Sequence, residues 1–236
     1  MYCILPFEQA FYKKFDMDVH YVGHPLVDAI QNFKETAVTS DQFQTEFGLN
    51  GNKIMALLPG SRLQEIKTKL PIMLEAAKGF DQMEILIGGA PNIPEKFYLD
   101  LAGSVPIKVI PNRTYDLLNQ AHLAMVTSGT ATLETALFKV PQVVCYKGNP
   151  ISVSIARKLI KVDYISLVNL IMDKEVVKEL IQKDLTAENI KAVLLPMQDT
   201  DNEARKNLLS AYDELERILG GGGASEKTAS LLVGNA

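Results

Sequence analysis

The sequence lacks tryptophan and has few of the residues that mark several common classes of protein. Its two cysteines, Cys3 and Cys145, stand far apart in 236 residues, each inside an apolar run. This placement is typical of buried thiols rather than of a disulfide framework. The three histidines, His20, His24 and His122, show no metal-ligand spacing. We therefore expect no metal, histidines satisfied within the fold, and a reducing, cytoplasmic compartment.

Long hydrophobic runs and a strong charge of one sign are also absent. No apolar run reaches the ~18 residues of a membrane span. The first residues show neither the basic segment nor the long apolar segment of a secretory signal. The net charge of −4 and the sequence pI of about 5.5 disfavour a nucleic-acid-binding protein. The 47% hydrophobic content is ordinary for a globular protein that buries a core.

From Lys53 onward, short apolar runs alternate with segments of helical period. The runs have the length of strands and cover residues 54–60, 84–90, 107–111, 123–128 and 142–147. Between them, apolar residues recur at three- and four-residue intervals over 62–80, 93–102, 113–121 and 130–139. Such alternation predicts right-handed crossovers and a mostly parallel sheet covered on both faces. The predicted fold class is a doubly wound, Rossmann-like α/β domain with extra carboxyl-terminal helices.

The last third of the sequence has a mainly helical pattern. Helices are predicted over 149–161, 174–197 and 201–219, and a short β-branched run, 164–171, separates the first two. The basic residues Arg157, Lys158 and Lys161 fall on one face of the first helix, which is either solvated or a contact for anionic lipid. The glycines Gly220 to Gly223 predict a hinge before a short terminal helix capped by Ser225.

The first thirty residues do not fit the repeat. Residues 2–5 and 6–15 indicate a strand and a helix, 19–26 an extended link, and 31–42 a polar spacer. A lone strand and helix cannot bury their own apolar faces, so they either pair with the edge of the main sheet or have a partner outside this chain. We therefore divide the sequence into a remnant of another domain, a linker, the α/β domain, and a hinge with a terminal helix, over 1–22, 23–52, 53–219 and 220–236.

A small, flexible sequence follows the predicted strand 123–128. In open α/β sheets, ligands bind at the carboxyl ends of strands, where glycine lets a ligand approach the backbone and the next helix offers free N–H groups. Ser128, Gly129 and Thr130 fit such a phosphate site. Glu134 would repel a bare phosphate, so we expect it to accept hydrogen bonds from sugar hydroxyls. An ordinary turn, with Thr130 or Ser128 capping the helix, explains these residues about equally well.

A second sequence of the same kind favours a nucleotide. Gly60 and Ser61 follow the strand 54–60, and Arg62 can direct two N–H donors onto a diphosphate. The helix dipole mildly disfavours a cation at a helix start, so a purely structural Arg62 is the weaker interpretation. The glycine-rich segment 87–92 has no charged residue and indicates a tight turn. Asn169 is a polar amide in an apolar run and either donates to a phosphate or ties the backbone.

Seven segments, taken in order, resemble the lipid-A-disaccharide synthase family. They are PFEQAFY, VGHP, LLPGSRLQEI, GGAP, TSGTATLE, ARKLIKVDYISLVNLI and GASEKTA. The family is similar in fold to the two-domain B-type glycosyltransferases. The resemblance covers nearly the whole chain and implies that VGHP is the link into the carboxyl-terminal, UDP-sugar donor-binding domain, while the piece before it ends the acceptor domain.

The resemblance also implies an activity, partners and roles for residues. The family transfers 2,3-diacylglucosamine from UDP to 2,3-diacylglucosamine 1-phosphate without a metal or cofactor, which implies peripheral work at the inner face of the inner membrane. It places Glu134 at the ribose, and the diphosphate against Gly60, Ser61, Arg62, Ser128, Gly129, Thr130 and Asn169. The family's general base belongs to the acceptor half, for which this chain has no counterpart.

We therefore expect the chain to bind UDP without turnover and to self-associate through apolar residues at its two ends. Two alternatives stay open at this point. One is another UDP-sugar enzyme of the same architecture, such as a 2-epimerase, which would need its own acid and base across a cleft. The other is a non-catalytic nucleotide-binding module.

Overall fold

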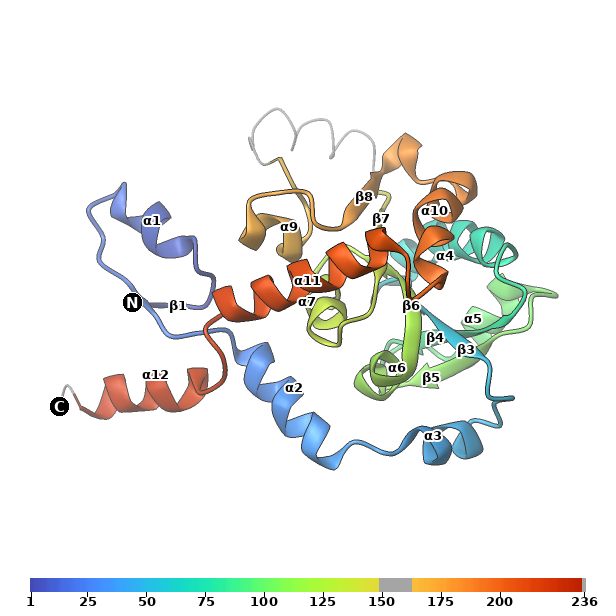
Figure 1. Cartoon of the computed structure of the whole chain (residues 1–236), viewed down its shortest axis with the longest axis horizontal. Helices are drawn as coiled ribbons and strands as arrows, with labels where there is room; N and C mark the ends of the chain where they lie inside the picture. The colour runs from blue at the N-terminus through green and yellow to red at the C-terminus, as the bar shows by residue number, and fades with distance from the viewer. Residues whose placement is uncertain (149–162, 235–236) are drawn as a thin grey trace.

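The computed structural model describes residues 1–148 and 163–234, and it contains a main sheet of six parallel strands (Figure 1). The strand order is β5-β4-β3-β6-β7-β8. The strands are β3 (Lys53–Leu58), β4 (Met83–Gly89), β5 (Lys108–Pro111), β6 (Ala121–Thr127), β7 (Gln142–Tyr146) and β8 (Lys178–Ile181). The doubly wound α/β class predicted from the sequence is confirmed.

Helices cover both faces of this sheet. One face packs against α4 (Leu63–Ala77), α5 (Glu95–Ala102) and α10 (Ala187–Leu194). The other packs against α2 (Pro25–Thr36), α3 (Ser40–Glu46), α6 (Thr114–Gln120), α7 (Thr130–Leu137), α9 (Leu167–Met172) and α11 (Glu203–Ile218). Successive strand residues point to opposite faces, so Leu57 joins the first core and its neighbour Leu58 joins the second. Both cores are therefore continuous with the central strands.

The region from 53 to 147 has the strands and helices that the apolar pattern predicts, but the region after it differs. The helix predicted over 174–197 is wrong in its first half, where β8 pairs with β7 at the edge of the sheet. The 3₁₀ turn η1 (Gln182–Asp184) then leads into α10, and a second turn, η2 (Pro196–Gln198), follows it. The β-branched run 164–171 includes most of α9. The helix predicted over 149–161, with Arg157, Lys158 and Lys161, lies outside the described residues.

The stretch 23–52, predicted as a linker with a polar spacer, forms two helices of the main core. Val27 and Ile30 of α2 are buried, and Phe43 of α3 is 0% exposed. The start of α3 carries a capping box, because Thr39 Oγ1 accepts from Gln42 N at 3.3 Å and Gln42 Oε1 accepts from Thr39 N at 2.9 Å. The prediction of a linker is therefore corrected: buried apolar residues attach this segment to the α/β domain.

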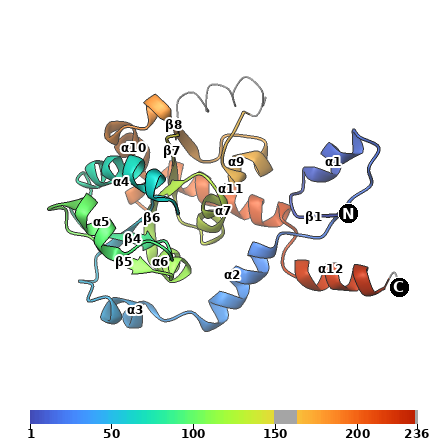
Figure 2. The same ribbon diagram turned by 180° about the vertical axis from the view of Figure 1, so that it is seen from behind.

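The first strand finds its partner within the chain and not at the edge of the main sheet. β1 (Tyr2–Cys3) pairs in parallel with β2 (His20–Tyr21), and α1 (Glu8–Lys13) lies between them in sequence. This small unit lies to one side of the main sheet (Figure 2). Of the apolar residues at the two ends that we expect to lack a burial site, Ile4, Phe7, Phe11 and Leu232 are exposed, whereas Leu5 and Leu231 are half-buried.

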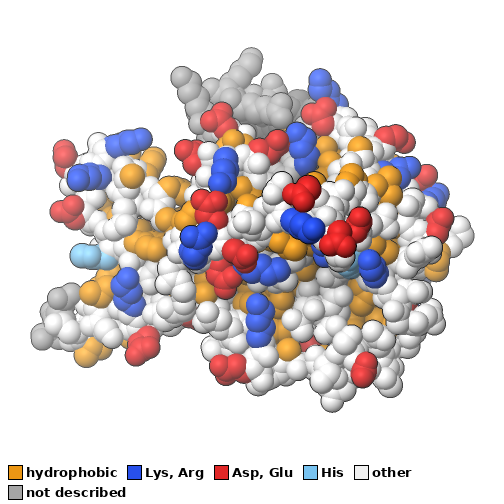
Figure 3. Space-filling view, viewed as in Figure 1, with side chains coloured by type: hydrophobic (Ala, Val, Ile, Leu, Met, Phe, Trp, Pro, Cys, Tyr) orange, Lys and Arg blue, Asp and Glu red, His pale blue; other side chains and the backbone are white. Residues whose placement is uncertain are grey.

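The charged residues alternate in sign over the face that α11 covers (Figure 3). Lys139 lies 2.7 Å from both Asp213 and Glu216, and Lys174 lies 2.9 Å from Glu214. Such mixed pairs at a surface contribute little to stability and do not build a field of one sign. Within residues 1–148 and 163–234, no helix combines the length and apolar character that crossing a bilayer requires.

The terminal helix α12 (Ala224–Val233) is anchored where it begins, against α2. Its cap is Gly223, not the expected Ser225, and no side chain of its own satisfies its first amides. Instead, the Asp28 carboxylate of α2 accepts hydrogen bonds from Gly223 N and, at 3.4 Å, from Ser225 N. A carboxylate at a helix start also complements the positive end of the helix dipole.

Replacing Asp28 by alanine should release α12 while leaving the α/β domain folded. The loss of a capping acceptor costs about 1 kcal/mol, so we expect faster hydrogen exchange over 224–233 and little change in the melting temperature. Glu35→Ala removes an exposed carboxylate from the same helix and is the matched control. Equal exchange over 224–233 in both variants would contradict the assignment of Asp28 as the anchor.

Candidate functional site

A cavity of about 740 Å³ opens at the carboxyl ends of β3, β4, β5 and β6. The loops that follow these strands line it, together with the first turns of α4, α6 and α7. Seven of the eight residues predicted for the site line this cavity: Gly60, Ser61, Arg62, Ser128, Gly129, Thr130 and Glu134. A cavity at this edge of a parallel sheet is the usual ligand site of open α/β folds.

The loop after β3 brings a cation to the rim of the cavity. Arg62 is the residue before α4, its side chain is 80% exposed, and its Nη1 lies 2.9 Å from Glu65 Oε1. Gly60 has a φ of +122°, and a Cβ built on it would lie 2.6 Å from Glu65 Oε2. A side chain at this position would therefore be strained and would displace the carboxylate that holds Arg62.

The loop after β6 leaves the start of α7 without a side-chain cap. Gly129, with a φ of +147°, precedes the helix, and neither Ser128 nor Thr130 accepts from its first amides. Ser128 Oγ instead donates to Ile165 O at 2.8 Å. The alternative of a turn with Ser128 or Thr130 as the cap is therefore wrong in this structure. Because Thr130 and Ala131 line the cavity, the positive end of this helix dipole faces it.

Glu134 is a half-buried carboxylate of the cavity wall. Burial raises its pKa, and a hydrogen bond from Tyr115 opposes part of that rise. In turn, burial, the charge of Glu134 and this hydrogen bond raise the pKa of Tyr115 to about 12. The phenol therefore donates to the carboxylate, which keeps further lone pairs for other donors such as ligand hydroxyls.

Tyr115 belongs to an aromatic cluster that sequence reasoning did not identify. Its ring centroid lies 5.5 Å from that of Phe33 and 5.3 Å from that of Phe138, and both Phe33 and Tyr115 line the cavity. Its position in the sequence was the available signal. Tyr115 falls in the first turn of a helix that directly follows a strand, and Arg62 and Thr130 lie at the starts of two other such helices. Phe33 comes from α2, so no local pattern identifies it.

The acidic side chains of the cavity each have a partner within the protein. Glu65 pairs with Arg62, and Glu134 accepts from Tyr115. Asp116 lies 3.0 Å from Arg113. The hydrogen bond to Asp116 is the largest cause of the raised pKa of Arg113, and the hydrogen bond to Glu46 is the next largest. Over the described part of the chain, each lining carboxylate therefore already has a partner in the protein.

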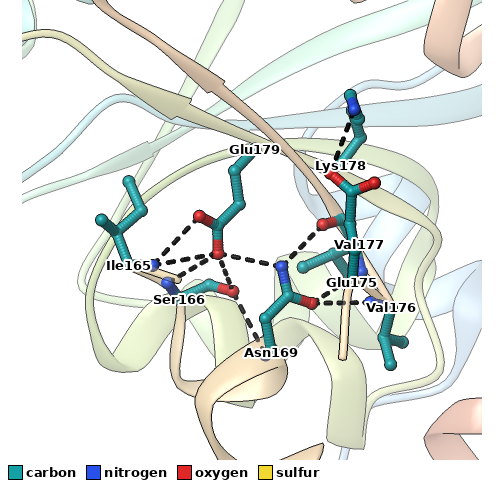
Figure 4. A network of polar contacts seen from close by, with 8 residues as sticks. All are labelled: Ile165, Ser166, Asn169, Glu175, Val176, Val177, Lys178 and Glu179. Atoms are coloured by element: carbon teal, nitrogen blue, oxygen red, sulfur yellow. Dashed lines mark hydrogen bonds and ion pairs between the residues drawn. The ribbon is translucent and has the colours of Figure 1, made fainter. Parts of the chain in front are cut away.

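Asn169 is the one predicted site residue that the structure places outside the cavity lining. It is 0% exposed, and its amide joins α9 to the strand β8 (Figure 4). Its Oδ1 accepts from Val176 N at 2.8 Å and Val177 N at 2.9 Å, while its Nδ2 donates to Val177 O and Glu179 Oε1, both at 2.9 Å. The structure corrects the assignment to the phosphate side in favour of the second interpretation, a tie between backbone segments.

Two of the three histidines, His24 and His122, and both cysteines agree with the expectation of structural roles, while His20 is exposed. His24 Nδ1 accepts from Leu26 N at 3.2 Å at the start of α2, and His122 Nε2 lies 2.9 Å from Gln198 O. Burial lowers the pKa of both rings, which favours their neutral forms. Cys3 and Cys145 are buried free thiols.

Solved structures define the class of protein to which this fold belongs. A UDP-GlcNAc 2-epimerase from Neisseria meningitidis, bound to UDP-GlcNAc, superposes with a TM-score of 0.66 at 16% identity, over 97% of this chain and 60% of that chain. The calicheamicin glycosyltransferase has a TM-score of 0.59 at 14% identity, over 99% of this chain and 53% of that one. The chain therefore has a fold shared by B-type glycosyltransferases and UDP-sugar epimerases.

Sequence comparison narrows this class to one family. The family model described as lipid-A-disaccharide synthetase matches residues 1–225, and the chain belongs to this family. A lipid-A-disaccharide synthase of Nitrosococcus oceani is 37% identical over 247 residues, and one of Syntrophus aciditrophicus is 38% identical over 241. Each alignment covers 99% of this chain and 62% of the relative. The chain thus spans less than two thirds of the length of these curated relatives.

The role of Asn169 can be tested by stability. Asn169→Ala leaves the N–H groups of Val176 and Val177 without their acceptor in a buried site and removes one of the donors to Glu179, so we expect the free energy of unfolding to fall by about 2–4 kcal/mol. Asn189→Ala removes an exposed amide that also bonds to backbone and is the matched control. Urea denaturation measures both, and an unchanged unfolding midpoint for Asn169→Ala would contradict the tie.

The raised pKa of Glu134 predicts a pH dependence. The folded state takes up this proton at a higher pH than the unfolded chain, so the ionised group lowers the free energy of unfolding above its folded pKa. Glu134→Gln should therefore gain stability relative to the parent at pH 7, and this advantage should shrink as the pH falls through the folded pKa. Urea unfolding at several pH values measures this advantage, with Glu35→Gln as the control. An advantage of Glu134→Gln that grows on acidification would contradict the prediction.

Proposed function

We propose that this chain is the donor-binding part of a lipid-A-disaccharide synthase and holds the UDP group of UDP-2,3-diacylglucosamine in the cavity at the carboxyl edge of its main sheet. The family supports the reaction, and a similar fold binds UDP-GlcNAc in the Neisseria meningitidis epimerase. The observation that carries the proposal is the convergence of Arg62, the uncapped start of α7 and Glu134 on one cavity.

Each of these groups suits one part of the nucleotide because of its charge and hydrogen-bonding capacity. Arg62 and the first amides of α7 are donors, which suits the diphosphate. Glu134 is an acceptor beside an aromatic wall, which suits the ribose hydroxyls. The diphosphate can approach the backbone at Gly60, Ser61 and Gly129. Asn169 and Glu179 stabilise the backbone beside the cavity, since Glu179 accepts from Ile165 N and Ile165 O accepts from Ser128.

The reaction requires a proton acceptor as well as a site for the leaving group. Transfer to the hydroxyl of 2,3-diacylglucosamine 1-phosphate removes its proton while negative charge builds on departing UDP, which the donors described above stabilise. Because the lining carboxylates are already engaged, we place the general base in the acceptor-binding part that the longer relatives contain. Peripheral contact with the inner face of the membrane and self-association through the exposed apolar residues at the two ends of the chain complete the proposal.

The division of roles predicts different losses for two substitutions. Arg62→Ala should weaken UDP by about 1.5–3 kcal/mol, because a charge-assisted contact is lost, and it should weaken pyrophosphate as well. Glu134→Ala should weaken UDP and uridine but leave pyrophosphate unchanged. Calorimetric titration measures all three ligands, and Arg217→Ala, on an exposed face of α11, is the control.

Equal losses on UDP and pyrophosphate in both variants would refute the division of roles. No binding of UDP by the parent chain would overturn the proposed function itself. Disaccharide synthesis by this chain alone would contradict the placement of the general base elsewhere.

A further inference from the structure

One hydroxyl of the cavity wall has no hydrogen-bond partner in the protein. Three side chains of the described ranges have a buried polar atom without such a partner: Thr127, Lys139 and Gln142. Lys139 is compensated by its two carboxylates at 2.7 Å, and the Gln142 amide nitrogen bonds to Thr132 O inside the core. Thr127 alone of the three lines the cavity.

Thr127 is the last residue of β6 and lies directly before the loop that leads into α7. It is only 7% exposed, so water reaches it poorly, and its neighbour across the sheet is the fully buried Cys145. A buried hydroxyl without a partner destabilises the folded state, because it has given up its hydrogen bonds to water. Such groups are rare in native proteins and call for a physical reason.

Three small hydroxyls near Thr127 in sequence use their proton inside the protein. Ser128 Oγ donates to Ile165 O, Thr132 Oγ1 donates to Gly129 O at 2.8 Å, and Thr135 Oγ1 donates to Ala131 O at 2.7 Å. Thr127 differs because it stands at the end of a strand and has no carbonyl of a preceding helical turn to bond. Its hydroxyl is therefore available to a ligand in the cavity.

The surroundings of Thr127 favour an acceptor that carries negative charge. The uncapped start of the eight-residue helix α7 lies three residues further along the chain. On the α4 side of the cavity, the cations Arg62 and Lys69 share the single carboxylate of Glu65, at 2.9 Å and 3.9 Å, and Lys69 is 2% exposed. Arg62 and Lys69 thus outnumber the one carboxylate between them, while the carboxylate Glu134 belongs to α7.

We propose that Thr127 is a substrate-binding residue whose Oγ1–H donates to a phosphate oxygen of the nucleotide diphosphate. This inference rests on the proposed UDP-sugar function and adds to it a contact outside the predicted site residues. The ligand supplies the acceptor that the folded protein lacks, so the hydroxyl opposes stability in the free protein and favours binding. The Thr127 hydroxyl therefore has opposite effects on the stability of the free protein and on ligand affinity, and one substitution that removes it tests both.

The test replaces the hydroxyl by a methyl group of similar size. Thr127→Val should bind UDP roughly ten- to a hundredfold more weakly, bind uridine as the parent does, and melt at the same or a higher temperature without ligand. Thr127→Ser keeps a hydroxyl and should retain UDP binding. Thr135→Val makes the same change at a buried threonine outside the cavity and should leave UDP affinity unchanged.

The outcomes separate this inference from the function on which it rests. If the parent binds UDP and Thr127→Val binds it equally well, the contact is wrong while the proposed function stands. A Thr127→Val chain that loses stability as much as Thr135→Val would show that the hydroxyl already has a partner, which also overturns the contact. If the parent fails to bind UDP, the proposed function and this inference fail together.

Discussion

Parallel pairing on both sides of β3 is the constraint on which the rest of this structure depends. Leu57 lies opposite Ile87 of β4 and Met125 of β6, so all three strands run in the same direction and end at the same edge. Parallel neighbours require a crossover between them, and the crossover helices cover both faces. The loops after β3 and β6 are therefore adjacent, although more than 60 residues separate Gly60 from Ser128 in the sequence. The cavity forms because these strands run in the same direction, and its chemistry comes from the residues in the loops that follow them.

The sequence predicts the fold well where burial is complete on both faces of a strand and poorly where it is one-sided. The runs from Lys53 to Tyr146 are nearly all apolar, so they indicate buried parallel strands without help from tertiary contacts. β8 reads KELI, and only Leu180 of its four residues is buried, so its pattern also fits a helix surface and pairing with β7 decides between them. The apolar residues of α2 and α3 stand among many polar ones, and their burial depends on a core built by residues far along the chain. Local propensity is a weak prior in such segments.

The site was predictable to the extent that its residues follow a strand in sequence. Gly60 to Arg62 and Ser128 to Thr130 satisfy that rule, and Glu134 lies one helical turn further. Asn169 was correctly identified as a polar group that needs partners, yet the sequence does not reveal that Glu179, on another element, would be one of them. Phe33 reaches the cavity from α2, and Tyr115 acquires its role by contact with Glu134. The hydroxyl of Thr127 is distinguished only by a missing partner, which is a property of the folded structure and not of any motif.

The small unit of β1, α1 and β2 joins the main domain beside the beginning of α12, and Leu5 packs against the main core. The chain leaves this unit at Gly23, and it passes from α11 to α12 at Leu219 to Gly223. The two passages touch, since Tyr21 Oη donates to Leu219 O at 2.8 Å and a Cβ on Gly23 would lie 3.4 Å from that of Ala224. Gly23, Gly220, Gly221 and Gly223 all have positive φ. Backbone of this kind favours glycine, so a side chain at these positions would strain the passage that carries it. Because the two passages touch, a change of backbone in one of them would also displace the other, and with it the element that the other attaches to the α/β domain.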